Sequence, residues 1–248
     1  QSLPSTEPPD CCIIVGTKRI PVHKTALQLN SSLLTSGDVT YNKQSELIEI
    51  EVVPEFSEHF LLVSKIVNSF YTGDFDFVGE NMKIVYKFAK CYSIQWMMDY
   101  VRPMLVDYIK KDEGCDRFVE ILKFAQSIWC TDLSETCCEL LDSELIGKIS
   151  EPDMISQFDF FTIKSITSSD KLRIPEKDVF DLVVVWLKLD STRCENFGAI
   201  LENIQYHFIE SDYLSDAVFD FVLEQRNLPD SSRKTVLKKV RDSMKQVP

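Results

Sequence analysis

Residues 10–27 read DCCIIVGTKRIPVHKTAL, and they contain two short apolar runs separated by a turn. The run 12–15 is rich in β-branched residues, which favour strands. Residues 16–18 can reverse the chain, so that 19–22 returns as a second strand. Pro21 lacks a backbone N–H and therefore belongs at a sheet edge or a strand end. The stretch predicts a strand, a turn, a second strand and then the start of a helix.

The chain that follows changes its hydrophobic period. Residues 46–53 (ELIEIEVV) alternate charged and apolar side chains, which predicts a half-buried strand with Glu46, Glu49 and Glu51 in water. From Pro54 onward apolar residues recur at helical spacing, and Gly73 ends that helix. Two more helices are expected over 81–92 and around 98–108. In the second of these, Pro103 predicts a kink or a late start.

Every segment after residue 114 has the pattern of a helix. Short polar joints separate these segments, which is typical of stacked antiparallel helix pairs. The fold class is therefore α+β and mainly helical: a flexible lead-in over 1–9, a mixed domain over 10–112 and an all-helical domain over 113–248. The helices are expected at 116–129, 133–147, 151–157, 159–167, 176–189, 194–203, 211–225 and 231–245.

Composition and charge exclude several classes of protein. The 248 residues are 44% hydrophobic and 27% charged, as in folded soluble proteins. No apolar run is long enough to span a membrane, and the first ten residues lack the pattern of a secretory signal. We therefore expect a cytoplasmic or nuclear protein whose eight cysteines are reduced. A net charge of −12 argues against nucleic-acid binding. The basic residues near the end of the chain are expected to face water: Arg233, Lys234, Lys238, Lys239, Arg241 and Lys245.

The sequence contains no pattern that indicates catalysis, a cofactor or a metal. Its seven glycines never have the spacing of a phosphate-binding loop, and no Ser lies in a G-x-S-x-G turn. The three histidines are far apart and there is no C-x-x-C, so we expect no zinc site. His23 is expected to cap a helix or to bond locally. Trp96, Trp129 and Trp186 are expected to anchor the core.

The first domain resembles the BTB (POZ) family. That family opens with an Asp, a β run, a Gly turn, an apolar strand and a His-Lys or His-Arg pair; residues 10–24 contain all of these in order. Its Tyr-Thr-Gly word is present as Tyr71-Thr72-Gly73. Residues 87–109 (KFAKCYSIQWMMDYVRPMLVDYI) are similar to its next two helices. The resemblance implies a small sheet flanked by helices.

The second domain resembles the BACK family. Residues 112–125 resemble the opening helix pair of that family, and 204–222 resemble a later helix entry. The motif most specific to the BACK family is Val179-Phe180 followed by Trp186-Leu187, Asp190 and Arg193. Together the two resemblances imply a protein-interaction module that acts by proximity and needs no catalytic residue. Many such chains form dimers and recruit the third cullin, as substrate adaptors of a cullin-RING E3 ubiquitin ligase.

The resemblance also implies particular surfaces. The cullin-like surface would comprise Asp38, Val39, Tyr41, Tyr92, Trp96 and Phe118, and Asp10 and Lys24 would lie at the seam of a BTB homodimer. Two departures leave an alternative open. Asp38 and Thr40 stand where cullin binders carry a hydrophobic residue and a Glu, and the prolines of residues 1–9 replace the family's swapped N-terminal helix. The alternative is a BTB–BACK scaffold that binds no cullin and assembles another complex, in the nucleus for example.

Overall fold

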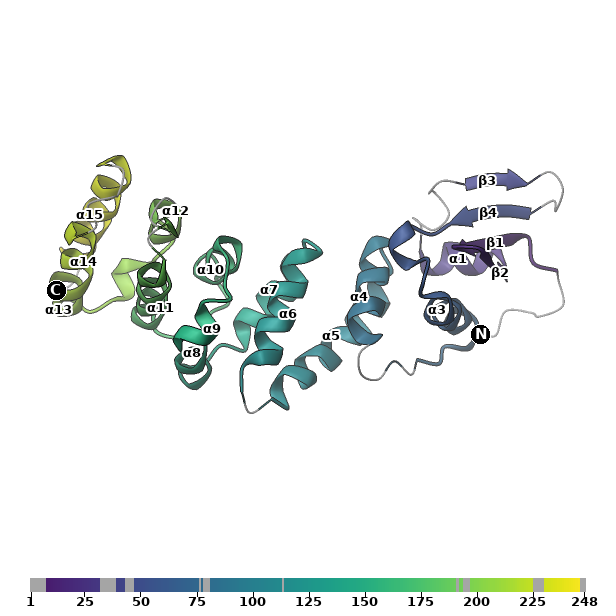
Figure 1. The fold of residues 1–248 in the computed structure, drawn as a ribbon, viewed down its shortest axis with the longest axis horizontal. Coiled ribbons are helices and arrows are strands. Elements are labelled where there is room, and N and C mark those ends of the chain that lie inside the picture. Colours follow the sequence, from purple (N-terminus) through teal and green to yellow (C-terminus); the bar gives the residue numbers. More distant parts are fainter. Residues whose placement is uncertain are drawn as a thin grey trace. The chain divides into compact units, whose positions relative to one another are not determined.

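The chain forms two compact units in the computed structural model, Gln1–Asp107 and Tyr108–Pro248. The first contains strands and helices, and the second contains helices (Figure 1). This is the α+β, mainly helical organisation that the sequence predicts. The structure describes residues 8–31, 39–42, 47–75, 77, 81–112, 114–190, 192–193, 197–224 and 230–245.

A four-stranded sheet in the order β2-β1-β4-β3 forms the centre of the first unit. β1 pairs antiparallel with β2 and parallel with β4, and β3 pairs antiparallel with β4. Pro21 lies in the edge strand β2, as predicted. The β1–β2 turn contains Gly16 at φ +62°, where a Cβ would lie 3.1 Å from the Ser57 carbonyl oxygen. The strands are β1 (Cys11–Val15), β2 (Lys18–Val22), β3 (Val39–Asn42) and β4 (Leu47–Glu51).

Helices pack on this sheet and against one another. α3 contacts α1, α4 and β2. It ends at Gly73, which has a left-handed φ of 71°, as its glycine predicts. α5 begins at Gln95, well before Pro103, so the expectation of a late start was wrong. The elements are α1 (Lys24–Asn30), the 3₁₀ turn η1 (Pro54–Phe56), α3 (Phe60–Thr72), α4 (Asn81–Cys91) and α5 (Gln95–Lys110).

Two expectations about the strands need correction. Val39 and Tyr41, for which the sequence predicts no strand, belong to β3, because their backbones pair with β4. Glu49 is buried rather than solvated, since it lies between neighbouring strands and its Oε1 is 3.0 Å from Nη2 of Arg19. Glu51 is exposed as expected. Asp38 and Glu46 lie outside the described residues.

Successive helices build the second unit. The expected helix 133–147 is in fact two, because Asp142 starts a new one by accepting a hydrogen bond from Leu145 N at 2.8 Å. The helix predicted over 176–189 has those bounds. The elements are α6 (Asp116–Ser127), α7 (Thr131–Glu139), α8 (Ser143–Ile149), α9 (Pro152–Ile155), α10 (Phe160–Thr167), α11 (Glu176–Leu189), α12 (Phe197–Leu201), η3 (Tyr206–Phe208), α13 (Ser211–Tyr213), the π-helical η4 (Leu214–Val218), α14 (Phe219–Glu224) and α15 (Asp230–Met244).

Trp186 anchors the core of this unit, as the sequence predicts. Its side chain is 1% exposed, and its Nε1 donates to the Phe158 carbonyl at 2.8 Å. The guanidinium of Arg193 lies 4.6 Å from the Trp186 ring and donates to the Trp186 carbonyl at 2.8 Å. The most specific motif of the second domain therefore stabilises the fold, because its side chains join the end of α11 to the segment before α10.

Candidate interaction surfaces

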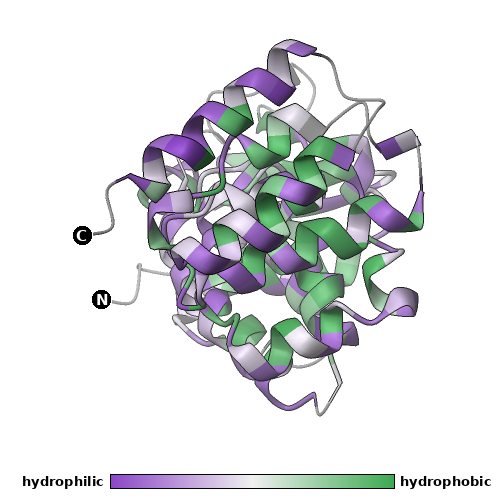
Figure 2. Ribbon diagram, turned by 90° about the vertical axis from the view of Figure 1, so that its left-hand side faces the viewer, coloured by the Kyte–Doolittle hydropathy of each residue, from purple (hydrophilic) through white to green (hydrophobic). Residues whose placement is uncertain are grey.

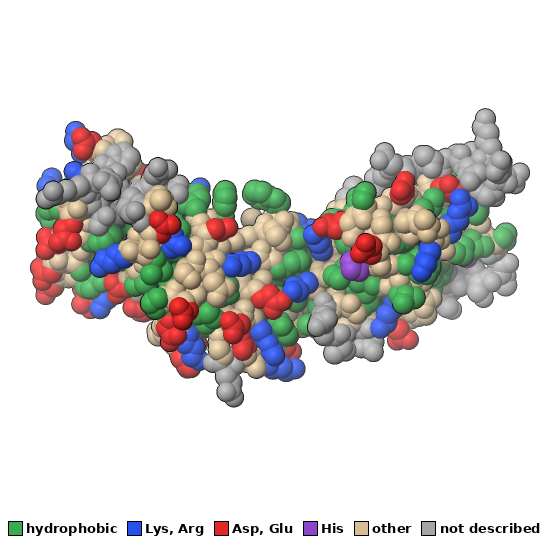
Figure 3. Space-filling view, viewed as in Figure 1, with side chains coloured by type: hydrophobic (Ala, Val, Ile, Leu, Met, Phe, Trp, Pro, Cys, Tyr) green, Lys and Arg blue, Asp and Glu red, His purple; other side chains and the backbone are tan. Residues whose placement is uncertain are grey.

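An open apolar groove of about 870 Å³ lies in the second unit, lined by the C-terminal half of α6, by α7 and by α10. Trp129 and Phe161 line it, and their side chains are 83% and 60% exposed. Figure 3 shows hydrophobic side chains projecting from the surface over this part of the chain. Exposed aromatic rings beside an apolar depression are typical of a protein-binding site. This surface is called the α6–α10 groove below.

Trp129 reaches the surface through a strained backbone. It follows α6 with a φ of 52°, in the left-handed region that bulky residues rarely adopt. Cys130 N donates to Ala125 O at 2.8 Å and Trp129 N donates to Gln126 O at 2.9 Å. These bonds define a Schellman helix end, in which glycine is the usual left-handed residue. The chain therefore carries a strained, exposed tryptophan where glycine would be more stable, which indicates a function for the ring.

The opposite wall of the groove is held by polar contacts at the start of α10. Asp159 accepts hydrogen bonds from the N and Oγ1 of Thr162, both at 2.7 Å. Thr162 Oγ1 also lies 2.9 Å from Gln126 Oε1, and Gln126 Nε2 donates to the Phe161 carbonyl at 3.4 Å, so α10 is tied to α6 beneath the groove. Phe161 thus projects from the first turn of a capped helix, whose backbone is held in place by these contacts.

The cysteines beneath the groove do not indicate covalent chemistry. Cys138 lines the groove, and burial raises the pKa of its thiol to about 11. Burial raises the pKa of the adjacent Cys137 further still. Both are thiols rather than thiolates near neutral pH, and the thiolate is the nucleophile. The groove can therefore interact with another molecule through apolar contact and complementary shape, and not through a reactive thiolate.

A cluster of aromatic rings lies on the first unit. Phe75 packs against Trp96, with ring centroids 4.5 Å apart, and against Tyr100 at 5.4 Å. The Tyr100 hydroxyl donates to the Phe75 carbonyl at 3.0 Å. Trp96 is 37% exposed and Tyr100 is 41% exposed. Trp96 is therefore accessible to a partner, as the cullin-like surface requires, and it is not a fully buried core residue.

Two other members of that surface are buried. Tyr92 is 8% exposed, and its hydroxyl accepts a hydrogen bond from Val53 N at 2.9 Å. Desolvation raises the pKa of its phenol. Phe118 is 1% exposed, on the inner face of α6. Both expectations of surface contact are corrected: Phe118 lies on the apolar side of the amphipathic α6, and Tyr92, just after the end of α4, packs its ring against Phe88 and Phe56. Asp38 lies outside the described residues, and Val39 and Tyr41 lie in β3.

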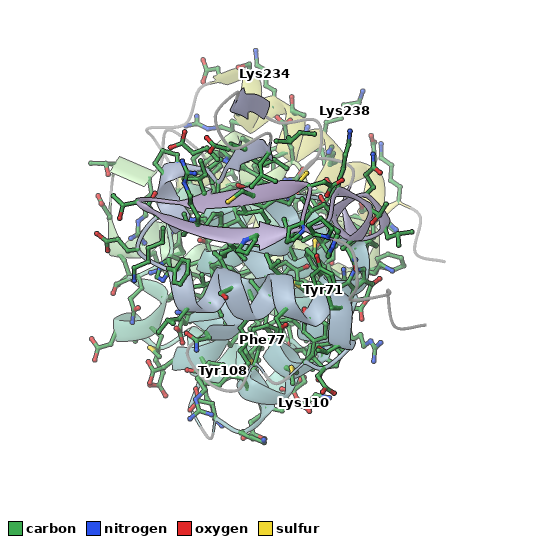
Figure 4. The ribbon with its side chains drawn as sticks, turned by 90° about the vertical axis from the view of Figure 1, so that its right-hand side faces the viewer. Tyr71, Phe77, Tyr108, Lys110, Lys234 and Lys238 are labelled. Carbon is green, nitrogen blue, oxygen red and sulfur yellow. The ribbon has the colours of Figure 1, made fainter. Side chains whose placement is uncertain are left out.

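The expected dimer-seam residues have a visible role within one chain. Asp10 Oδ1 accepts a hydrogen bond from Lys24 N at 2.7 Å, at the start of α1. His23 occupies the N-cap position of α1 without a capping side-chain bond. Its Nδ1 instead lies 3.1 Å from the hydroxyl of Tyr71, the α3 residue labelled in Figure 4. These bonds orient α1, and the role of Asp10 and Lys24 in a homodimer stays a prediction.

The described residues form neither a metal site nor a membrane-spanning helix. Within the ranges that the structure describes, no three His, Cys, Asp or Glu side chains gather as a metal site would require. Over the same ranges, no helix combines the length and apolarity needed to cross a membrane.

Sequence reasoning missed the α6–α10 groove because it assigned Trp129 to the core. Tryptophan is highly buried on average, so its type alone favours a core position. The available signal was its place at the end of the predicted helix 116–129, next to a polar joint. Nothing in the sequence shows that the residue adopts a left-handed conformation.

Comparison with known proteins is consistent with the two-unit organisation. The sequence model of the BTB/POZ domain family matches residues 1–109. The sequence model of the BACK (BTB And C-terminal Kelch) family matches residues 118–219. Kelch-like protein 7 of Homo sapiens is 23% identical over 84% of this chain and 35% of its own length. Kelch-like ECH-associated protein 1A of Danio rerio is 20% identical, over 78% of this chain and 31% of its own. Immune evasion protein OPG047 of Monkeypox virus is 36% identical over 26% of this chain and 13% of its own. The chain spans about a third of the length of the two kelch-like relatives.

Proposed function

The chain joins a BTB/POZ domain to a BACK domain and belongs to the BTB–BACK family, and we propose that it is a substrate-adaptor subunit of a cullin-RING ubiquitin ligase that binds the third cullin. An adaptor holds a substrate near the transfer machinery and raises its local concentration. It needs binding surfaces and no catalytic group of its own.

The observation that carries the proposal is the exposed, strained Trp129 at the α6–α10 groove. A left-handed residue other than glycine costs about 1–2 kcal/mol. The ring obtains little contact within its own chain in return, since it is 83% exposed. Buried tryptophans are among the strongest anchors at protein interfaces. The groove is therefore proposed as a docking site for a protein partner, and Trp96 and Tyr100 as a second contact on the first unit.

A scaffold that binds no cullin is the alternative, and one observation favours it. Asp38 and Thr40 replace the hydrophobic residue and the Glu of the family's cullin-binding word. Loss of an apolar anchor at the centre of an interface typically costs about 2 kcal/mol, or about thirtyfold in affinity. Under the adaptor proposal, Trp129 and Trp96 compensate for this loss.

Calorimetric titration of the full chain with the N-terminal region of the third cullin tests the proposal. Binding is expected, and Trp129→Ala should weaken it on the order of thirtyfold. Phe208→Ala is the matched control, because Phe208 is 69% exposed and does not line the groove. A folded wild-type chain that binds no cullin rejects the adaptor in favour of the scaffold. Binding that is unaffected by Trp129→Ala rejects the groove as the docking site.

A further inference from the structure

Charge is strongly segregated along this chain. Residues 230–248 carry six basic and two acidic side chains, a net charge of +4, whereas residues 1–229 carry a net charge of −16. The positive part is mainly α15. In Figure 2, which looks onto the α13–α15 end of the second unit, α15 is mostly hydrophilic. A concentrated positive charge on an otherwise acidic protein selects which surfaces can approach it.

The exposed cations of α15 form one ridge. Lys234, Lys238, Arg241 and Lys245 are spaced 4, 3 and 4 residues apart, which places them on one face of the helix. The buried residues Val236 and Val240 lie on the opposite face. Figure 4 shows Lys234 and Lys238 at the outer surface. Among the described residues, no carboxylate lies within 4 Å of Lys234, Lys238 or Arg241, whereas Nζ of Lys245 lies 4.0 Å from Oδ1 of Asp242.

A ridge of opposite charge runs along the preceding helical segment. Asp212, Asp216, Asp220 and Glu224 recur every four residues, and all four are exposed. The segment includes the π-helical η4, whose wider turn helps to keep residues four apart on one side. No described cation lies within 4 Å of these carboxylates. α14, which carries Asp220 and Glu224, packs against α15, and the guanidinium of Arg241 lies beside the ring of Phe219, the residue before Asp220.

Apolar side chains accompany the two ridges. Leu223 is 47% exposed. The ring of Phe219 lies 5.7 Å from the guanidinium of Arg241 and so connects α14 to the basic ridge. An apolar centre with charged margins is the usual composition of a protein interface.

We propose that this bipolar face binds the same face of a second copy of the chain. A two-fold axis parallel to the helices places the basic ridge of each copy opposite the acidic ridge of the other, and Leu223 near the centre. A foreign acidic surface would fit less well, because it would meet the acidic ridge beside the basic one. Nucleic acid would meet the same repulsion. Only a partner with both ridges in the reversed order satisfies the whole face, and a second copy has that arrangement.

Sedimentation of the full chain at several concentrations tests this association. At low salt the mean mass should rise with concentration, and 0.5 M NaCl should reverse the rise, because salt screens exposed charges. Lys234→Glu with Lys238→Glu should lower the association constant on the order of thirtyfold, and Asp216→Lys with Asp220→Lys should do the same. A homodimer through the BTB domain would add a constant mass that neither pair of substitutions changes. The test of the proposal is therefore the change in the association constant that the substitutions cause.

Charge exchange provides the decisive control. The two double variants, mixed in equal amounts, should associate with each other, because the intact acidic ridge of the first faces the intact basic ridge of the second, and the new glutamates face the new lysines. The chain with all four substitutions should again associate with itself. Association that the substitutions leave unchanged, or its absence from the folded wild type at low salt, overturns the proposal. Tighter binding of the wild type to polyglutamate than to itself also overturns it, in favour of a foreign acidic partner.

Discussion

Replacement of Trp129 by glycine should stabilise the protein and weaken partner binding at the same time. Trp129 occupies the left-handed position of the helix end after α6, at φ 52°. Glycine removes the strain of about 1–2 kcal/mol, and its greater freedom in the unfolded chain costs about 0.5–1 kcal/mol. The ring is 83% exposed, so its loss removes little burial relative to a realistic unfolded chain.

The net gain is therefore about 0.5–1 kcal/mol, which corresponds to an increase of roughly 1–4 °C in Tm for a chain of this size. Calorimetric melting measures the stability, and titration with the third cullin's N-terminal region measures the binding. Affinity should fall on the order of thirtyfold, because the groove loses its aromatic anchor.

Two variants separate strain from function. Ser93 follows α4 in the same kind of helix end, also at φ 52°, and Ile94 N donates to Ala89 O at 2.8 Å. Ser93→Gly should therefore stabilise the chain by a similar amount without affecting groove binding. Trp129→Ala keeps the strain and loses the ring, so it should weaken binding without the gain in Tm. A Trp129→Gly protein that melts below the wild type would show that the ring contributes to stability and that our account of its position is wrong.

Four other substitutions test the structure. Trp186→Ala should lower the free energy of unfolding, measured by urea denaturation, by about 3–5 kcal/mol, because it opens a cavity and leaves the Phe158 carbonyl without its donor. An unchanged midpoint of urea unfolding would contradict the core role of Trp186. Burial raises the pKa of Glu176 above its ordinary 4.5, so the carboxyl group holds its proton more tightly in the folded state than in the unfolded state. The free energy of unfolding of the wild type should therefore fall as the pH rises from 4.5 through the folded-state pKa. Glu176→Gln, whose carbonyl can still accept from Gln205 N, should remove that decline, and parallel pH profiles would refute the assignment. Gly16→Ala should destabilise the protein by about 1–2 kcal/mol, because Gly16 has a positive φ and the Ser57 carbonyl lies nearby. Gly147→Ala inside α8 meets nothing within 4 Å and should stabilise the protein by about 0.5–1 kcal/mol. Shifts of Tm in the same direction for both variants would contradict the turn geometry.

Local patterns predicted most of the fold because the helices of this chain are strongly amphipathic. The helix over 176–189 and the end of α3 at Gly73 follow directly from periodicity and from glycine at a helix end. β3 was missed because its four residues carry little local signal, and their strand conformation depends on pairing with β4. The burial of Glu49 likewise depends on its neighbours in the sheet, which no local window contains.

The interaction surfaces were harder to predict for a different reason. Tyr92 follows Phe88 by four residues, so the helical pattern itself placed it on the buried face, and the family resemblance was wrongly given more weight. Phe118 shares the inner face of α6 with Ile121 and Leu122. Trp129 is exposed because of the conformation of a single backbone position, and hydrophobic periodicity does not register such a feature.

The parallel pairing of β1 with β4 has a consequence for the kinetics of folding. Cys11 lies beside Ile48, so this part of the sheet cannot close until the intervening chain has been brought together, at a cost in loop entropy. The second unit joins mainly neighbouring helices, such as α6 with α7 and α14 with α15. Proteins with local contacts fold faster than those with distant strand pairings. During synthesis the N-terminal hairpin leaves the ribosome well before its partner strand, and its unpaired edge must wait for β4 before the sheet is complete.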